Sequence, residues 1–270
     1  MKKIYYKLRR IFRELGRYRI SLYAANASFY MILAVFPTLM LLVGLLPVIG
    51  YGEADLLQAM EGLVPQVLYP LLEKVITDMS ANSSGVLLSA TALVAIWSSS
   101  RSVNCIQLGL NSIYGLRESR SYVVRRLTEM LYMLFLLLAL LLTLVAHGFG
   151  QEIAAFCARQ NIPILRLIAR ILQFRGLILL TLLTLLFTGI FCAFPNKKLR
   201  IRNAFPGAAL AALGWLVFTR FFSYYARMSS SYSALYGSLS TIAMGMFWLY
   251  ICLSILFYGS VLNLWLERRK

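Results

Sequence analysis

The sequence predicts an all-α membrane protein: a polytopic bundle of six transmembrane helices with both termini cytoplasmic, plus amphipathic interfacial helices. The first observation is composition, since 60% of the 270 residues are hydrophobic and only 14% are charged, with a mean hydropathy of +0.73. A soluble chain of this length cannot hide so much apolar surface. The second observation is that Lys and Arg cluster between long apolar runs, as they do in membrane proteins. The net charge of +17 is therefore assigned to loops at a membrane rather than to a nucleic-acid surface.

The apolar runs divide the chain into a basic N-terminal helix (1–20), a membrane domain (21–266) and a basic C-terminal tail (267–270). All runs but the second approach or exceed the roughly 20 residues that cross a hydrocarbon core of about 30 Å. The second run is shorter but continues into a polar extension. Backbone amides in lipid must be satisfied within a segment, and no alternating pattern indicates a barrel, so the runs are helices. The predicted spans are residues 24–46, 84–110, 127–147, 176–194, 204–224 and 239–264.

The orientation follows from the basic clusters, which lie before span one, between spans two and three, between spans four and five, and after span six. Six spans put all four clusters on one side, which the positive-inside rule makes the cytoplasm. The loop between spans three and four is an exception, because it carries basic residues on the outer side. Placing that loop in the cytoplasm would put two of the other basic clusters on the outer side of the membrane. Its basic residues are Arg159, Arg166, Arg170 and Arg175.

The N-terminal segment has apolar residues at helical spacing and basic residues on its other faces, which favours an amphipathic helix on an anionic inner leaflet. A basic tail that only sets the topology explains the same charges equally well. The following apolar core is too long for a cleaved signal peptide, so we expect an uncleaved first span. In the lipid-binding interpretation, the headgroup contacts are Arg9, Arg10, Arg13 and Arg17.

Two segments outside the spans, residues 54–79 and 152–174, are also amphipathic. Prolines interrupt both: Pro65 and Pro70 in the first, Pro163 in the second. We expect them to form short helices on the outer membrane face.

Residue chemistry argues against an enzyme. Hydrolysis of a phosphodiester with metal ions takes convergent carboxylates and histidines, whereas this chain has one histidine, His147, at the outer end of span three. The cysteines form no ligand or disulfide spacing, and no glycine-rich nucleotide loop is present. We therefore expect no enzymatic activity, no metal, no cofactor and no nucleic-acid partner.

The stretch "WSSSRSVNCIQLGLNSIYG", residues 97–115, is unusually polar for a membrane helix. At 100° per residue its polar side chains fall within an arc of about 120°. One interpretation is that Arg101 snorkels to the headgroups. The other is that the arc faces the bundle, where Arg101 pairs with Glu129 and begins a substrate path. The residues of this candidate path are Arg101, Asn104, Gln107, Asn111 and Glu129, with Arg220 near the outer end of span five as a second anion contact or a snorkelling residue.

Span five carries small residues at helical spacing, which allow another helix to approach closely. They are Gly207, Ala208, Ala211, Ala212 and Gly214.

Four blocks in order resemble the YihY/BrkB family of bacterial inner-membrane proteins, and the resemblance covers residues 21–263. It implies a six-span protein of the cytoplasmic membrane. Some members carry an old ribonuclease label, and others are linked to serum resistance or to movement of lipid precursors. The blocks are "AANASFYMILAVFPTLMLLVGLL", "IWSSSRSVNCIQLGLNSIYG", "FPNKKLRIRNAFPGAALAALGWLVF" and "YSALYGSLSTIAMGMFWLYICLSILFYGSVLN".

Two functions are open at this point. The first is a transporter or flippase for an anionic, amphipathic, lipid-like substrate, which fits polar faces inside a bundle and arginines near both boundaries. The alternative is a membrane scaffold for envelope proteins that transports nothing. A continuous polar cavity favours transport, whereas a solid apolar bundle with an exposed patch favours a scaffold. The expected partners are anionic membrane lipids, with a second copy of the chain or an envelope protein left open.

Overall fold

A computed structural model of the chain describes residues 15–50, 52–60, 63–81, 85–118, 120–148, 175–197, 199–228 and 231–268. Within these residues the regular structure is helical throughout, which confirms the all-α class. The described helices are α2 (Ile20–Ile49), α3 (Glu53–Ala59), the 3₁₀ turn η1 (Gln66–Leu68), α4 (Tyr69–Ala81), α5 (Gly85–Tyr114), α6 (Tyr122–Gly148), α9 (Arg175–Ala193), α10 (Ile201–Met228) and α11 (Ser231–Glu267).

Each of the six segments predicted to span the membrane coincides with one long helix: α2, α5, α6, α9, α10 or α11. In the described residues, four stretches are long and apolar enough to cross a membrane. The six-span count and the cytoplasmic termini stay predictions. The four stretches are Ile20–Pro47, Gly176–Ala193, Ile201–Ala226 and Ser240–Glu267.

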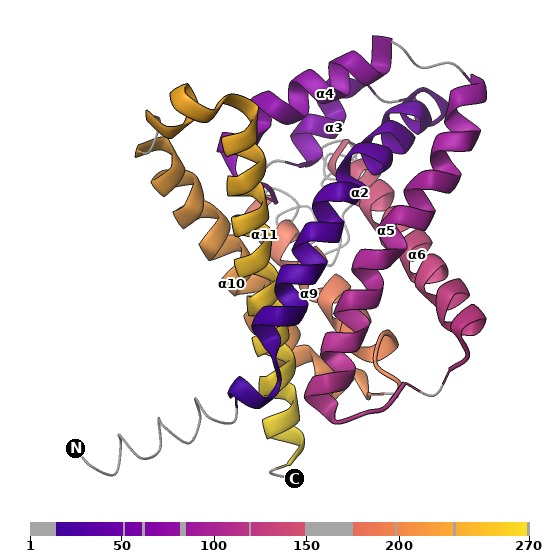
Figure 1. Cartoon of the computed structure of the whole chain (residues 1–270), viewed down its shortest axis with the longest axis vertical. Coiled ribbons are helices and arrows are strands. Elements are labelled where there is room, and N and C mark those ends of the chain that lie inside the picture. Colours follow the sequence, from indigo (N-terminus) through magenta and orange to yellow (C-terminus); the bar gives the residue numbers. More distant parts are fainter. Residues whose placement is uncertain are drawn as a thin grey trace, which may run out of the picture.

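The long helices run up and down, and α2 begins at the same end of the bundle at which α11 finishes (Figure 1). We call this the basal end; α5 and α9 also end there, and α6 and α10 begin there. Helix α2 packs along α5 and α11, and α10 packs between α9 and α11. Helices α3 and α4 lie at the opposite, apical end (Figure 1). The basal end therefore gathers the two turns that join α5 to α6 and α9 to α10.

The predicted helices in residues 54–79 are confirmed as α3 and α4, and their apolar side chains face the bundle. Leu56, Leu72 and Ile76 are buried in a core that they share with the apical half of α2 and with α10 and α11. Proline fits where it was expected, since Pro65 precedes η1 and Pro70 lies in the first turn of α4. The second amphipathic segment, residues 152–174, lies outside the described residues.

The small residues of α10 do admit a close neighbour, which is α11. A Cβ built at Gly207 would overlap the carbonyl oxygen of Gly259, and one built at Gly259 would lie 2.5 Å from the carbonyl oxygen of Gly207. Beside this contact Asn263 accepts a hydrogen bond from the Gly207 N–H (2.7 Å) and donates one to the Ala204 carbonyl (2.9 Å). Two backbones and one buried amide thus fix the basal part of the α10–α11 pair.

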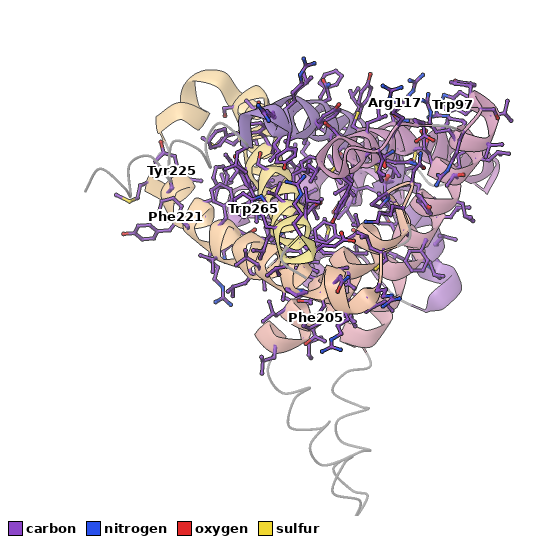
Figure 2. The ribbon with its side chains drawn as sticks, turned by 90° about the horizontal axis from the view of Figure 1, so that it is seen from below. Trp97, Arg117, Phe205, Phe221, Tyr225 and Trp265 are labelled. Carbon is purple, nitrogen blue, oxygen red and sulfur yellow. The ribbon has the colours of Figure 1, made fainter. Side chains whose placement is uncertain are left out.

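The outer face of α10 carries large apolar side chains that are half or more exposed in the described structure. Viewed from the basal end, Phe205, Phe221 and Tyr225 point outward along this helix (Figure 2), with 50%, 64% and 59% of their surface exposed. In a membrane protein such side chains face lipid.

Candidate functional site

A cavity of about 820 Å³ lies inside the bundle, where α2, α4, α5, α6, α9 and α11 all contribute side chains. Its lining is almost entirely apolar, with Leu side chains the most frequent and Val next. Its volume is within the range of sites that hold small molecules. The polar side chains in the lining are Thr38, Ser99, Ser102 and Thr241.

The polar groups of this lining are partly engaged with each other. The hydroxyls of Thr38 and Ser99 lie 3.1 Å apart in a hydrogen bond between α2 and α5, and the Ser102 hydroxyl donates to the Ser99 carbonyl (2.6 Å). A ligand in the cavity would therefore meet mostly methyl and methylene groups.

The cavity reaches the side of the bundle between α6 and α9. Phe135 of α6 and Leu185 of α9 both line it, yet 60% and 59% of their surfaces are exposed. Phe36 of α2 also lines the cavity and is 42% exposed. Among the described residues, these exposed apolar side chains mark an opening between α6 and α9, and in a membrane protein such side chains face lipid. We call this opening the lateral mouth.

A first polar cluster joins α5 to α6 at Glu129, a residue only 2% exposed. Arg125 and Arg126 precede Glu129 by four and three residues, so one helical face brings them together. Their nitrogens lie 3.5 and 3.3 Å from the Glu129 carboxylate, which also accepts a hydrogen bond from the Asn104 amide. The Arg126 guanidinium also donates to the Trp97 carbonyl (2.7 Å) and stacks 4.2 Å above the Trp97 ring. The Asn104 and Trp97 hydrogen bonds thus support the buried ion pair, although the Arg126 Nε is buried without a hydrogen-bond partner in the described structure.

A second polar cluster lies closer to the basal end, around Glu118 in the α5–α6 turn. One carboxylate oxygen accepts from Gln107 (3.4 Å) and Asn111 (3.3 Å), and the other accepts from the Asn196 amide (3.0 Å). Asn196 belongs to the α9–α10 turn, and its backbone N–H donates to the Asn111 side-chain oxygen (2.9 Å). Its amide also donates to the Arg117 carbonyl (3.2 Å). One asparagine therefore fastens the two basal turns to each other.

A third contact reinforces this connection one step into the bundle. The Tyr132 hydroxyl of α6 donates to the Ala193 carbonyl at the end of α9 (2.5 Å). The Tyr132 ring stacks on the Phe194 ring, with centroids 4.7 Å apart and planes 9° apart. Helices α6 and α9 are thus joined at the basal end and separated above it by the cavity.

The predicted polar arc of α5 divides in the structure. Gln107 and Asn111 are buried, at 1% and 3% exposure, and together with Asn104 they face α6 and the two turns. Arg101 is exposed. In the described part of the chain, the ion pairs of Glu129 are made by Arg125 and Arg126, so the predicted pairing of Arg101 with Glu129 is wrong. Arg125 and Arg126 share a face of α6 with Glu129 because they precede it by four and three residues.

Of the other predicted contact residues, the structure describes Arg220 and Arg17, and it assigns a ligand to neither. Arg220 is exposed, and its guanidinium lies near the start of α9, 3.9 Å from a Cβ built at Gly176. Arg17 is exposed next to the start of α2. Arg9, Arg10 and Arg13 lie outside the described residues. Whether the arc forms a substrate path stays a prediction.

Sequence reasoning missed Arg126, Glu118, Tyr132 and Asn196. The spacing of Arg125, Arg126 and Glu129 on one helix was a usable signal for the first. Glu118 and Asn196 lie in turns, and Tyr132 contacts a residue of another helix, so helical periodicity does not identify these three. Among the described residues, no group of three or more His, Cys, Asp or Glu side chains is placed to hold a metal ion.

The comparisons with known proteins are consistent with this architecture. A family model described as Virulence factor BrkB matches residues 11–270. The chain is 29% identical over 248 residues to the ribonuclease-like protein YfkH of Bacillus subtilis, covering 92% of this chain and 90% of that protein. It is 27% identical over 255 residues to a UPF0761 membrane protein of Chromohalobacter salexigens, covering 92% of this chain but only 60% of the relative.

A third relative, the UPF0761 membrane protein VP0125 of Vibrio parahaemolyticus, is 26% identical over 263 residues, which cover 93% of this chain and 78% of that protein. No solved structure matches the chain.

Proposed function

Because the chain belongs to the Virulence factor BrkB family of membrane proteins, we propose that it binds a lipid-like, anionic amphiphile and acts as a transporter or flippase for it. The observation that carries this proposal is the cavity of about 820 Å³ with its apolar lining and its lateral mouth. The partners in this proposal are membrane lipids, and no reaction is assigned to the protein. The name of the Bacillus relative describes that protein and adds no catalytic group to this one.

The lining favours an acyl chain over a polar solute. A sugar or nucleotide would lose its hydration in the cavity and find hydroxyls only at Thr38, Ser99, Ser102 and Thr241. An acyl chain loses no hydrogen bonds there. The lateral mouth supports the same choice, because a lipid would slide in sideways from the bilayer between Phe135 and Leu185.

The charge of the proposed ligand follows from the basic residues at the basal end. Arg117 is exposed and Arg125 keeps 30% of its side chain accessible, at the end of the bundle below the mouth. Figure 2 shows Arg117 at the basal rim, on the side of Trp97 and away from Phe221. Arginines at a membrane surface attract anionic headgroups. An amphiphile with its chain in the cavity and an anionic head at the basal rim satisfies both parts of the structure.

Gly189 provides a direct test of the cavity as a lipid site. It lines the cavity, and a Cβ built on it meets no atom within 4 Å, so a large side chain enters free space rather than the protein. We expect Gly189→Phe to reduce co-purified lipid, measured by native mass spectrometry, to about half or less, because the ring occupies volume that the chain needs. The matched control is Thr181→Phe, which adds the same ring at an exposed position of α9 outside the cavity lining. Equal lipid content in both variants would reject the cavity site and favour the scaffold function.

The same proposal includes six spans with a cytoplasmic basal end. In a chain whose native cysteines are replaced by serine, we expect Met60→Cys to react with an impermeant maleimide added outside intact cells, and Arg200→Cys to be protected. Met60 follows α3 at the apical end, and Arg200 precedes α10 at the basal end. Both positions retain accessible surface, so protection would report the side of the membrane. Labelling of position 200 from outside would overturn the orientation.

A further inference from the structure

In the described residues, a seam that holds the cavity separates two pairs of helices. Helix α9 packs principally along α10, whereas α6 packs principally along α5. Between these pairs lies the cavity, lined by Met133 of α6 and Leu186 of α9. The two pairs meet again at the basal end, through Tyr132 and through Asn196.

The basal contacts are polar and incompletely satisfied. Asn196 contributes three donated hydrogen bonds, to Asn111, Glu118 and the Arg117 carbonyl. Yet the side-chain oxygens of Gln107 and Asn196 are buried without a hydrogen-bond partner in the described structure. A partly satisfied polar network is worth less than a complete one. Water can replace these hydrogen bonds at small net cost when the turns separate.

The hydrogen-bond network around Asn196 lies on the basal side of the cavity. Asn111 lies nine residues beyond the cavity residue Ser102 on α5, which is about 14 Å along the helix. At this level the apolar core includes Leu110 and Ile113 of α5 and Phe194 of the α9–α10 turn. Beside it, the polar contacts between the two turns in the described residues are the hydrogen bonds around Asn196, with the Tyr132 hydroxyl bonded to the end of α9. Separating the two turns on this polar side of the core would extend the lateral mouth toward the basal surface.

We propose that Asn196 and Glu118 form a gate that closes the basal end of the cavity and opens by parting the α9–α10 turn from the α5–α6 turn. The gate rests on the proposed function, since it controls access to the same cavity. It would let a headgroup pass between α6 and α9 while the chain stays in the apolar lining. Opening exposes Glu118, Asn111 and Asn196 to water, where each finds hydrogen bonds.

The test measures how fast a cavity residue is reached from water. The full-length protein, with its native cysteines replaced by serine, carries Ser102→Cys, a position 3% exposed in the closed structure. A small, charged methanethiosulfonate reagent is added to the detergent-purified protein and the modification rate is followed by mass spectrometry. Asn196→Asp places a carboxylate where an amide now donates to Glu118 (3.0 Å). We expect this variant to raise the rate about tenfold or more, because a charged hydrogen bond is replaced by repulsion.

Two further variants make the result specific. Adding Glu118→Gln to Asn196→Asp restores one carboxylate facing one amide and should return the rate to that of the parent. Lys197 lies next to Asn196 in the α9–α10 turn and forms an accessible ion pair with Glu267 at the end of α11 (2.7 Å). Lys197→Ala removes this ion pair and should leave the modification rate unchanged. If Asn196→Asp fails to give a monodisperse protein, Tyr132→Phe, which removes only the hydroxyl bound to Ala193, should raise the rate in its place.

An unchanged rate in Asn196→Asp and Tyr132→Phe would overturn the gate, as would an equal rise in Lys197→Ala. The outcome is separable from that of the lipid proposal. If Asn196→Asp raises the modification rate but Gly189→Phe leaves the lipid content unchanged, the gate is supported and the lipid site is rejected. If Gly189→Phe lowers the lipid content but the modification rate does not change in Asn196→Asp, the lipid site is supported and the gate is rejected.

Discussion

Gly207→Ala is expected to prevent the protein from being recovered in folded form. The added methyl group would overlap the Gly259 carbonyl oxygen, which is backbone and cannot rotate away. Helices α10 and α11 would have to separate, and Asn263 would then lose its hydrogen bonds to Gly207 and Ala204 (2.7 and 2.9 Å). Overpacking alone costs about 1–3 kcal/mol, and buried polar groups left unpaired cost about 1–3 kcal/mol each. The sum is comparable to the whole stability of a typical domain.

The measurement is the monodisperse fraction of detergent-extracted protein on size exclusion, with the apparent melting temperature of whatever is recovered. Two glycines provide graded controls. A Cβ at Gly214 would lie 2.8 Å from a methyl group of Ile255, a side chain that can rotate, so Gly214→Ala should cost less. Gly189→Ala enters open space and should be neutral or stabilising. Recovery of Gly207→Ala at parental yield and melting temperature would show that the α10–α11 contact is looser than described.

Glu129→Gln is expected to be the second most damaging change. The side chain is 2% accessible, and it compensates the Arg126 guanidinium, whose side chain is 8% accessible. The substitution keeps the shape but leaves that buried charge unpaired, which costs about 3–5 kcal/mol. The Arg125 side chain is 30% accessible, so water can solvate its charge and its ion pair contributes less to the lost stability. We expect a fall of several degrees or more in the apparent melting temperature, followed by tryptophan fluorescence.

The control is Glu267→Gln, which breaks the exposed pair with Lys197 and should cost at most about 1 kcal/mol. A double variant, Glu129→Gln with Arg126→Met, should recover part of the loss, since an apolar pair leaves no charge without a partner. Equal melting temperatures for Glu129→Gln and Glu267→Gln would show that Glu129 is not the centre of the buried cluster.

Helix positions followed from the sequence because lipid imposes a strong constraint on hydropathy and length. The helices at residues 24–46 and 239–264, for example, were predictable from apolar runs that leave few alternatives. The close approach of α10 was also predictable, because Gly207 and Ala211 lie one turn apart with no bulky side chain between them on that face. These features depend on residues near each other in the chain.

The candidate site was harder to predict, because it depends on contacts between distant segments. The arc of Asn104, Gln107 and Asn111 was identified correctly as polar and faces inward, but its partners lie on α6 and in two turns. Arg126 reaches Glu129 through i,i+3 spacing on α6, a local signal that the sequence carries, whereas the contact of Asn104 with Glu129 depends on the packing of α6 against α5. The cavity was not predictable from periodicity, since it is volume left unfilled by six packed elements.

The unequal lengths of the long helices tie the protein to the thickness of its bilayer. Helix α9 has 19 residues and is about 28 Å long, close to a hydrocarbon core of about 30 Å. Helix α11 has 37 residues and is about 55 Å long, so it must project beyond that core or tilt. A thicker bilayer leaves α9 short, and each ångström of mismatch costs a fraction of a kcal/mol. Since α9 forms one wall of the lateral mouth, the width of that mouth becomes a property of the surrounding lipid as well as of the protein.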